Sequence, residues 1–272
     1  MEEELLNVLL RVQQKKTDLP QPPEGGAILK FIMSSAQQDK IVSNAPFSGL
    51  GGCTVLLNDA GKRFNRDWIF RHLTYTFETG RSYAITGPNG SGKSTLLQSI
   101  AGSIQLSAGA IEYRVLNMEQ GMLKAAILTD TLSLIAAENF YRHLSIAAPY
   151  VELIEEMTAK EFLHFHQQFK PFTASVSIDE ILLLIGLEKA ADKQIRYFSS
   201  GMKQRVKLAQ AIFSDVPVLL LDEPCTNLDK SGYGLYHSLI ETYCQQKLII
   251  VSSNDEHEMD FCIKRLNIID YK

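Results

Sequence analysis

At residues 87–95 the chain reads Gly87-Pro88-Asn89-Gly90-Ser91-Gly92-Lys93-Ser94-Thr95. This run fits the phosphate-binding loop pattern G-x-x-x-x-G-K-S/T at each fixed position. Its glycines let the backbone curl, so that successive N–H groups point inward at phosphate oxygens. Lys93 brings a positive charge to the β- and γ-phosphates, and the Ser94 hydroxyl is placed to ligate Mg²⁺. The run therefore predicts a site for a nucleoside triphosphate.

The segments on either side of this loop support the match. Residues 82–86 read as a short buried strand, and residues 96–101 read as a helix that Gly102 ends. The N-terminus of such a helix favours an anion. A chance glycine turn is the alternative, but it does not account for the strand, loop and helix in this order.

A second motif lies at residues 218–224, where the sequence is VLLLDEP. A buried strand that ends in an acid places Asp222 beside the phosphate loop, where it can hold the Mg²⁺ shell. Glu223, the next residue, is suited to orient or deprotonate the attacking water. Alone, the motif is equally compatible with a strand that ends in a solvated acidic turn. Its combination with the phosphate loop favours the catalytic interpretation.

A third motif, FSSGMKQR, occupies residues 198–205. Two serines and a glycine before a basic helix form another anion-binding helix N-terminus. An ordinary helix cap followed by a solvated basic face is the alternative. The phosphate loop favours the first interpretation, because an ATPase with a second phosphate site usually uses it across a dimer.

Composition limits the remaining classes of function. The chain has 272 residues, of which 45% are hydrophobic, and this suits one large domain or one domain with an appendage. A net charge of −4 argues against a nucleic-acid partner. The four cysteines show no C-x-x-C spacing, which is typical of reduced thiols in a cytosolic protein. No secretory signal and no apolar run of roughly 18 residues is present, so we expect a cytoplasmic protein.

We predict a domain boundary after residue 52. Residues 1–52 contain a candidate amphipathic helix at 2–16 and then several prolines and glycines. We expect a flexible leader, with Met33 as a competing start, or alternatively a docking helix for a partner. Residues 53–272 are expected to form the nucleotide-binding domain.

The expected elements of this domain are strands and helices. Apolar, β-branched runs at 216–221 and 247–252 suit central parallel strands, which helices would connect. No element is predicted for residues 117–142. The further expected strands are 54–57, 73–77 and 111–114, and the further expected helices are 152–169, 178–185 and 200–213.

Together these motifs resemble those of the nucleotide-binding subunit of an ABC transporter, from about residue 54 to the C-terminus. Residues 87–95 resemble Walker A, residues 218–223 resemble Walker B, and residues 199–203 resemble a variant signature loop. Residues 225–229 resemble the loop that follows Walker B. The combination is highly specific, although no single motif is. The resemblance implies an α/β P-loop NTPase core with a parallel central sheet, an antiparallel β edge and an inserted helical subdomain at roughly 150–213.

The resemblance also implies an activity and partners. It implies an ATPase that binds ATP and Mg²⁺, dimerises head to tail with itself or a second ATP-binding subunit, and powers a separate transmembrane permease at the inner face of the membrane. Residues 147–165 resemble the equivalent region of small, single-domain exporter-type subunits, and only about 20 residues follow residue 252. Both features favour export over import. The implied metal ligands are Ser94 and Asp222, and the implied catalytic residues are Glu223 and Asn254. The implied nucleotide-binding residues are Phe64, Gly87, Pro88, Asn89, Gly90, Ser91, Gly92, Lys93, Ser94, Thr95, Ser199, Gly201 and Asp229.

Some of these assignments have alternatives. Phe64 stands where the family places an aromatic ring on adenine, but it could equally be a core phenylalanine. The family's glutamine is missing from the segment Ala147-Ala148-Pro149-Tyr150. Asn254 stands in place of the family's switch histidine, because His257 lies three residues beyond the expected position. Both departures bear on hydrolysis and coupling, not on nucleotide binding. The competing functions are a soluble ABC ATPase of assembly or translation and a nucleotide-bound regulatory subunit that hardly turns over.

Overall fold

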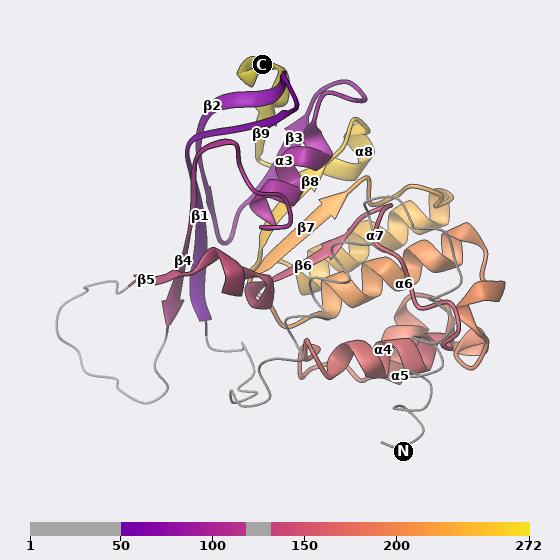
Figure 1. The fold of residues 1–272 in the computed structure, drawn as a ribbon. Helices are drawn as coiled ribbons and strands as arrows, with labels where there is room; N and C mark the ends of the chain where they lie inside the picture. Colours follow the sequence, from indigo (N-terminus) through magenta and orange to yellow (C-terminus); the bar gives the residue numbers. More distant parts are fainter. Residues whose placement is uncertain (1–49, 118–131) are drawn as a thin grey trace, which may run out of the picture.

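The centre of the molecule is a parallel β-sheet. A computed structural model describes residues 50–117 and 132–272 of the chain (Figure 1). In this part the sheet has five strands in the order β6-β7-β8-β3-β9, and each neighbouring pair is parallel. Their carboxyl ends therefore meet at one edge. The strands are β3 (Ser82–Thr86), β6 (Leu144–Ala147), β7 (Val218–Asp222), β8 (Leu248–Ser252) and β9 (Lys264–Asn267).

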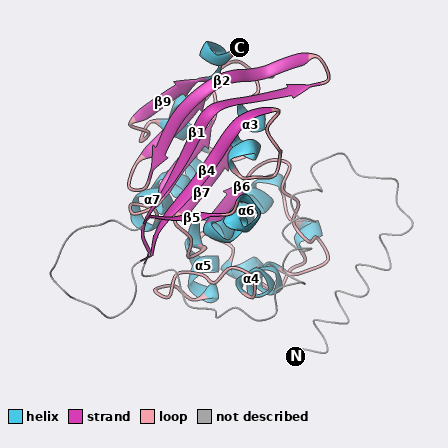
Figure 2. Ribbon diagram, turned by 60° about the vertical axis from the view of Figure 1, so that its left-hand side comes forward, coloured by secondary structure: helices cyan, strands magenta, loops and turns pink. Residues whose placement is uncertain are grey.

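A second sheet is antiparallel and has the order β2-β1-β4-β5. The expected antiparallel edge is thus a separate sheet, which lies at one end of the molecule while α4 and α5 lie at the opposite end (Figures 1 and 2). The strands of this sheet are β1 (Leu50–Phe64), β2 (Asp67–Glu78), β4 (Ala108–Asn117) and β5 (Leu132–Ile135). The α-helices are α3 (Lys93–Ile100), α4 (Ala159–Gln167), α5 (Ile178–Leu184), α6 (Ser200–Phe213), α7 (Lys230–Tyr243) and α8 (Glu256–Met259).

The parallel sheet separates two hydrophobic layers. Side chains alternate between the faces of a strand, so Leu219 and Leu221 of β7 pack with residues of α4, α5, α6 and α7. Val218 and Leu220 of the same strand pack with α3 and the antiparallel sheet. Burial on both faces explains the unbroken apolar sequence of β7 and β8.

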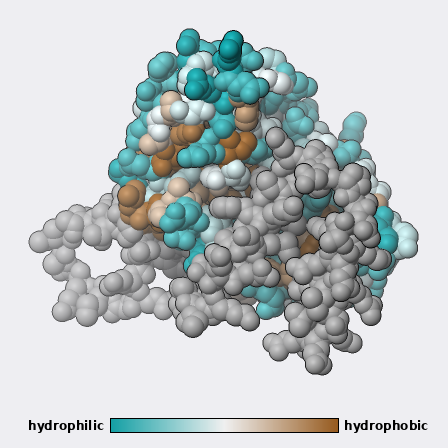
Figure 3. Space-filling view, viewed as in Figure 1, coloured by the Kyte–Doolittle hydropathy of each residue, from teal (hydrophilic) through white to brown (hydrophobic). Residues whose placement is uncertain are grey.

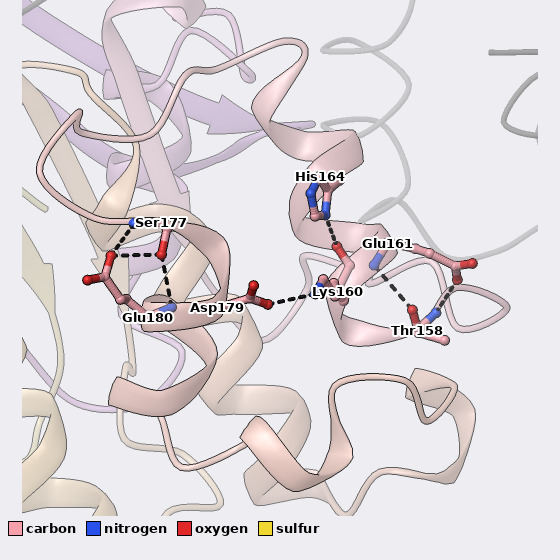
Figure 4. A network of polar contacts seen from close by, with 7 residues as sticks. All are labelled: Thr158, Lys160, Glu161, His164, Ser177, Asp179 and Glu180. Carbon is pink, nitrogen blue, oxygen red and sulfur yellow. Dashed lines mark hydrogen bonds and ion pairs between the residues drawn. The ribbon is translucent and has the colours of Figure 1, made fainter. Parts of the chain in front are cut away.

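The helices α4 and α5 begin with the same local structure (Figure 4). The Thr158 side chain accepts a hydrogen bond from the backbone N–H of Glu161, whose carboxylate accepts one from the N–H of Thr158. Ser177 and Glu180 repeat this capping box at α5. An ion pair of 2.7 Å joins Lys160 Nζ of α4 to Asp179 Oδ1 of α5. The predicted helix at 152–169 is therefore wrong in its first part, because the Thr158 cap starts the helix at Ala159.

The remaining elements were predicted in part. The strand at Ser82–Thr86 and the helix at Ser200–Phe213 are confirmed. The strands β6 and β9 and the helices α7 and α8 were not predicted. The candidate helix at 2–16 lies outside the described residues, so the boundary after residue 52 stays a prediction.

Hydrophilic and apolar side chains are unevenly distributed over the face of the molecule drawn in Figure 3. Figure 3 shows a mainly hydrophilic upper part, below which apolar side chains gather over the antiparallel sheet. Within residues 50–117 and 132–272, none of the helices is both long and apolar enough to cross a bilayer.

Candidate functional site

The candidate site lies at the carboxyl edge of the parallel sheet, where the turns after four strands meet. Ser252 at the end of β8 is in register with Asp222 of β7 on one side and with Ile85 of β3 on the other. On the far side of β7, Ala147 at the end of β6 is in register with Leu221. The fold therefore brings the phosphate loop, which follows β3, close to the acidic turn after β7.

The conformation of the phosphate loop requires its glycines. Gly92 has a φ of +103°, and a Cβ there would lie 2.2 Å from Ile69 Cγ2 of β2. Gly90 has a φ of +75° and faces open space. Gly92 precedes the first residue of α3, and no side chain caps this helix. Its first N–H groups can therefore bind an anion.

Lys93 is held inside the phosphate loop. Its side chain is buried, and its Nζ donates hydrogen bonds to the carbonyl oxygens of Gly87 at 2.9 Å and Pro88 at 3.4 Å. The loop therefore fixes the position of a cation that anionic phosphates can approach.

Asp222 carries the strongest sign of a missing ligand. It is only 1% exposed, and neither carboxylate oxygen makes a hydrogen bond of good geometry within the described part of the chain. Burial raises the pKa of this carboxyl, and the charge of Glu223 raises it too, while the nearby hydroxyls of Ser94, Ser252 and Tyr150 lower it. A buried carboxylate of this kind calls for a cation.

Further polar atoms surround Asp222. The buried hydroxyl oxygens of Tyr150 and Ser252, which lie near it, also have no hydrogen-bond partner of good geometry among the described residues, and neither does that of Ser91 in the phosphate loop. Over the same residues, no group of three or more His, Cys, Asp or Glu side chains could hold a metal by itself. This donor set fits Mg²⁺ that arrives with a nucleotide, since Mg²⁺ binds one or two protein oxygens together with phosphates and water.

Glu223 has an unusual backbone conformation. Its φ is +44°, which residues other than glycine rarely adopt. Its N–H donates to the carbonyl of Ser252 at 2.9 Å. Such strained residues concentrate at functional sites. The first residue beyond the buried strand is thus fixed by β8.

The turn after β8 is bonded differently. Asn254 Nδ2 donates to Asn89 Oδ1 of the phosphate loop at 2.6 Å. The buried carboxylate of Glu258 accepts from the Ser253 hydroxyl and, at 2.7 Å, from the N–H of Cys225. Glu258 was not predicted, because an acid in an exposed-looking run gives no sign in the sequence that it is buried. It joins the turns after β7 and β8.

The predicted residues outside this edge have structural contacts of their own. Phe64 is 45% exposed, and Lys62 Nζ lies 4.8 Å from its ring centroid, so the core alternative is wrong. Ser199 caps α6 by accepting from Met202 N at 3.3 Å. Asp229 caps α7 by accepting from Gly232 N at 2.9 Å.

Gly201 lies in the first turn of α6. A Cβ at this position would be 3.0 Å from the carbonyl oxygen of Asn227. The third motif and the loop after β7 are therefore in contact within one chain. A larger residue at this position would push the two segments apart.

A glycine loop between β3 and α3, next to an acid at the end of β7, defines a P-loop NTPase. The model of the family described as ABC transporter matches residues 70–226, more than half of the chain. The chain therefore belongs to the ABC transporter family and is an ATP-binding subunit of it. Proteins of this family are generally ATPases that bind ATP, typically with Mg²⁺.

The chain is similar to several individual proteins. It is 31% identical over 196 residues to the cytochrome c biogenesis ATP-binding export protein CcmA of Brucella abortus (strain 2308), covering 72% of this chain and 82% of that protein. It is 29% identical to the uncharacterized ABC transporter ATP-binding protein YybJ of Bacillus subtilis (strain 168), covering 74% and 86%. The structure of a putative ABC transporter ATP-binding protein from Pyrococcus furiosus aligns with a TM-score of 0.63 at 19% identity, covering 80% and 99%.

Proposed function

We propose that this chain binds and hydrolyses ATP at the edge formed by the turns after β3, β7 and β8, and that it powers export through a separate membrane permease. The observation that carries the proposal is the Asp222 carboxylate, which is buried beside the phosphate loop and makes no hydrogen bond of good geometry to the described residues. Burying a carboxylate in this way destabilises the free chain. A site that binds a metal nucleotide explains why it is there.

The proposed roles follow from the contacts. Lys93 exchanges its loop carbonyls for the β- and γ-phosphates, while the uncapped N-terminus of α3 binds phosphate oxygens. Ser94 and Asp222 hold Mg²⁺, which would neutralise charge on the phosphates. Glu223 orients or deprotonates the attacking water. The exposed ring of Phe64 stacks on the adenine.

We further propose a head-to-tail dimer with ATP between the subunits, in which Ser199, Gly201 and Asp229 face the nucleotide of the partner. Ser199 is exposed at the N-terminus of the 14-residue helix α6, where N–H groups favour an anion. The partner is a second copy or a second ATP-binding subunit. Closure and opening of such a dimer would move the permease.

The proposed direction of transport is supported by the name of a relative. The relative CcmA is named an export protein. The alternative of a regulatory subunit with slow turnover has two sequence observations in its favour, which are the missing glutamine near Pro149 and the neutral Asn254 in place of the family's histidine. Turnover by the purified subunit separates these two functions, and co-purification with a membrane permease separates both from a soluble ABC ATPase.

Binding is tested first with Lys93→Ala. This change removes a buried charge that bonds phosphate, and such charge-assisted hydrogen bonds contribute about 1.5–3 kcal/mol each. We expect ATP affinity to fall at least tenfold in titrations with a fluorescent ATP analogue. Lys264→Ala, at an exposed position on β9, is the matched control. Unchanged affinity in Lys93→Ala would remove the phosphate loop from the site.

The dimer is tested in a Glu223→Gln background, which retains ATP. Size-exclusion chromatography with Mg²⁺ and ATP should show a dimer, and adding Ser199→Arg should return it to a monomer with ATP still bound. The arginine would fill the space that the partner's ATP must occupy. A dimer that persists with Ser199→Arg would contradict the proposed interface, and Ser199 would then be a helix cap alone.

A further inference from the structure

We propose that the hydroxyl of Tyr150 orients the Asp222 carboxylate toward Mg²⁺, so that Tyr150 is a positioning residue of the nucleotide site. This inference rests on the proposed function and extends it to a residue outside all the predicted motifs. Tyr150 follows β6, whereas the phosphate loop follows β3 and the acidic turn follows β7.

The backbone around Tyr150 is fixed from two sides. Val151 N donates to the carbonyl of Ala148 at 3.1 Å, which closes a β-turn with Pro149 and Tyr150 at its centre. Lys207 Nζ from α6 donates to the carbonyl of Pro149 at 3.1 Å. The turn that carries Tyr150 is therefore held by the helix that begins after Ser199.

The position of the turn brings Tyr150 to Asp222. Ala147 is in register with Leu221, so the chain beyond β6 continues beside the end of β7. The Tyr150 ring packs against the core layer beneath α3, and its hydroxyl lies near the side chains of Asp222 and Gln98. The hydroxyl oxygen is buried and makes no hydrogen bond of good geometry within the described ranges.

The pairing of a buried donor with a buried acceptor has a clear chemical use. A phenol is a hydrogen-bond donor at neutral pH, and a carboxylate is only an acceptor. Carboxylates that ligate metals are themselves hydrogen-bonded, because such bonds fix which oxygen faces the metal. In this chain the Ser94 and Ser252 hydroxyls approach Asp222 from the start of α3 and the end of β8, and Tyr150 approaches it from the turn after β6.

A purely structural role for Tyr150 makes a different prediction. If the residue serves only as an apolar ring against the core, phenylalanine should replace it without consequence for Mg²⁺. If the hydroxyl orients Asp222, the same change should weaken metal-dependent binding and leave metal-free binding intact. Changing a hydrogen-bond partner of a metal ligand typically costs 10–100-fold in metal affinity or activity.

The test compares ATP affinity with Mg²⁺ and with EDTA, by calorimetry, in the Glu223→Gln background. The ratio of the two affinities reports the gain from Mg²⁺. Tyr150→Phe should reduce this gain by about tenfold. Tyr113→Phe is the matched control, because it also removes a buried hydroxyl, one that donates to the carbonyl of Ile100 at 3.0 Å. Its thermal stability should fall while its gain from Mg²⁺ is unchanged.

The outcomes separate the two proposals. If Mg²⁺ raises the ATP affinity of the Glu223→Gln protein, and raises it by the same factor when Tyr150→Phe is added, the inference about Tyr150 is wrong and the proposed function stands. If both tyrosine variants lose the gain equally, the loss reports general destabilisation and the inference is again overturned. If Glu223→Gln itself gains nothing from Mg²⁺, the proposed metal site fails and the inference fails with it.

Discussion

The turns after β7 and β8 are neighbours in the sheet, yet the two are built in opposite ways. The chain carries two acids where β7 ends: Asp222 is buried and makes no hydrogen bond of good geometry within the described residues, and Glu223 has a strained backbone. The turn after β8 begins with the neutral Ser253 and Asn254, whose amide is bonded to Asn89, and its acid Asp255 accepts a hydrogen bond from the Tyr233 hydroxyl at 2.8 Å. We propose that a ligand completes the first turn, whereas the side chain of Asn254 already has a partner in the free chain.

This difference predicts which of the two turns contributes more to ATP hydrolysis. Unpaired buried charge is costly, and backbone strain is concentrated at functional sites. A neutral side chain whose hydrogen bond is already formed is expected to interact more weakly with a ligand. We therefore expect large functional effects from changes after β7 and small ones from changes at Asn254.

The largest effect is expected for Glu223→Gln. An amide cannot accept the proton of the attacking water, so hydrolysis should fall by at least ~10²-fold while ATP stays bound. Phosphate release at saturating ATP measures the loss. Glu256→Gln is the control, because Glu256 is an exposed acid bonded to Arg265 at 2.6 and 2.7 Å, and it should hydrolyse at the normal rate. Normal hydrolysis by Glu223→Gln would place the base elsewhere.

Asp222→Asn should have two opposite effects. It removes a proposed metal ligand, so the Mg²⁺-dependent gain in ATP affinity should be lost. It also removes a buried charge, so the melting temperature of the nucleotide-free protein should rise at pH 7. Asp179→Asn, which only removes the exposed ion pair with Lys160, should not stabilise the protein.

The stabilisation by Asp222→Asn should depend on pH. The pKa of Asp222 is raised in the folded state by burial, so the unfolded chain loses this proton first as the pH rises. The cost of the charge is absent below the ordinary carboxyl pKa of about 3.9 and is complete above the folded pKa. The advantage of the asparagine variant should therefore shrink between pH 7 and pH 4. A variant less stable than the parent at pH 7 would mean that Asp222 is already well paired.

The smallest effect is expected for the pair Asn254 and Asn89. Each asparagine contributes one side of a neutral hydrogen bond, which contributes about 1 kcal/mol. Asn254→Ala and Asn89→Ala should each slow hydrolysis by about tenfold or less, and the double variant should be little worse than either. Asn58→Ala, at an exposed bond to Glu112, should have no effect. Additive losses would show that the two residues act independently.

The elements of this site differed in how far the sequence could predict them. The phosphate loop, β3, β7 and α6 have local patterns that encode both structure and position, such as the glycine spacing of 87–95 and the apolar run that ends at Asp222. The start of α4 was missed because Thr158 and Glu161 form a capping box inside a segment of good helix formers. Local propensity there gives way to the cap.

Other features depend on contacts between distant segments. Tyr150 meets Asp222 only because β6 pairs with β7, and Asn254 meets Asn89 only because β8 pairs with β3. Neither pairing follows from a pattern along the chain. The loss of the glutamine near Pro149 could be read from the sequence, but the tyrosine hydroxyl that approaches Asp222 could not.

The most direct test of the difference between the two turns is a single-turnover measurement of ATP hydrolysis by Glu223→Gln and Asn254→Ala, with each variant in the same excess over ATP and at the same saturating Mg²⁺. Loss of a general base costs at least ~10²-fold, and loss of one neutral hydrogen bond costs about tenfold or less. Asn254→Ala should therefore hydrolyse ATP at least about tenfold faster than Glu223→Gln. Equal rates in the two variants would contradict this account and would make Asn254 an essential catalytic group.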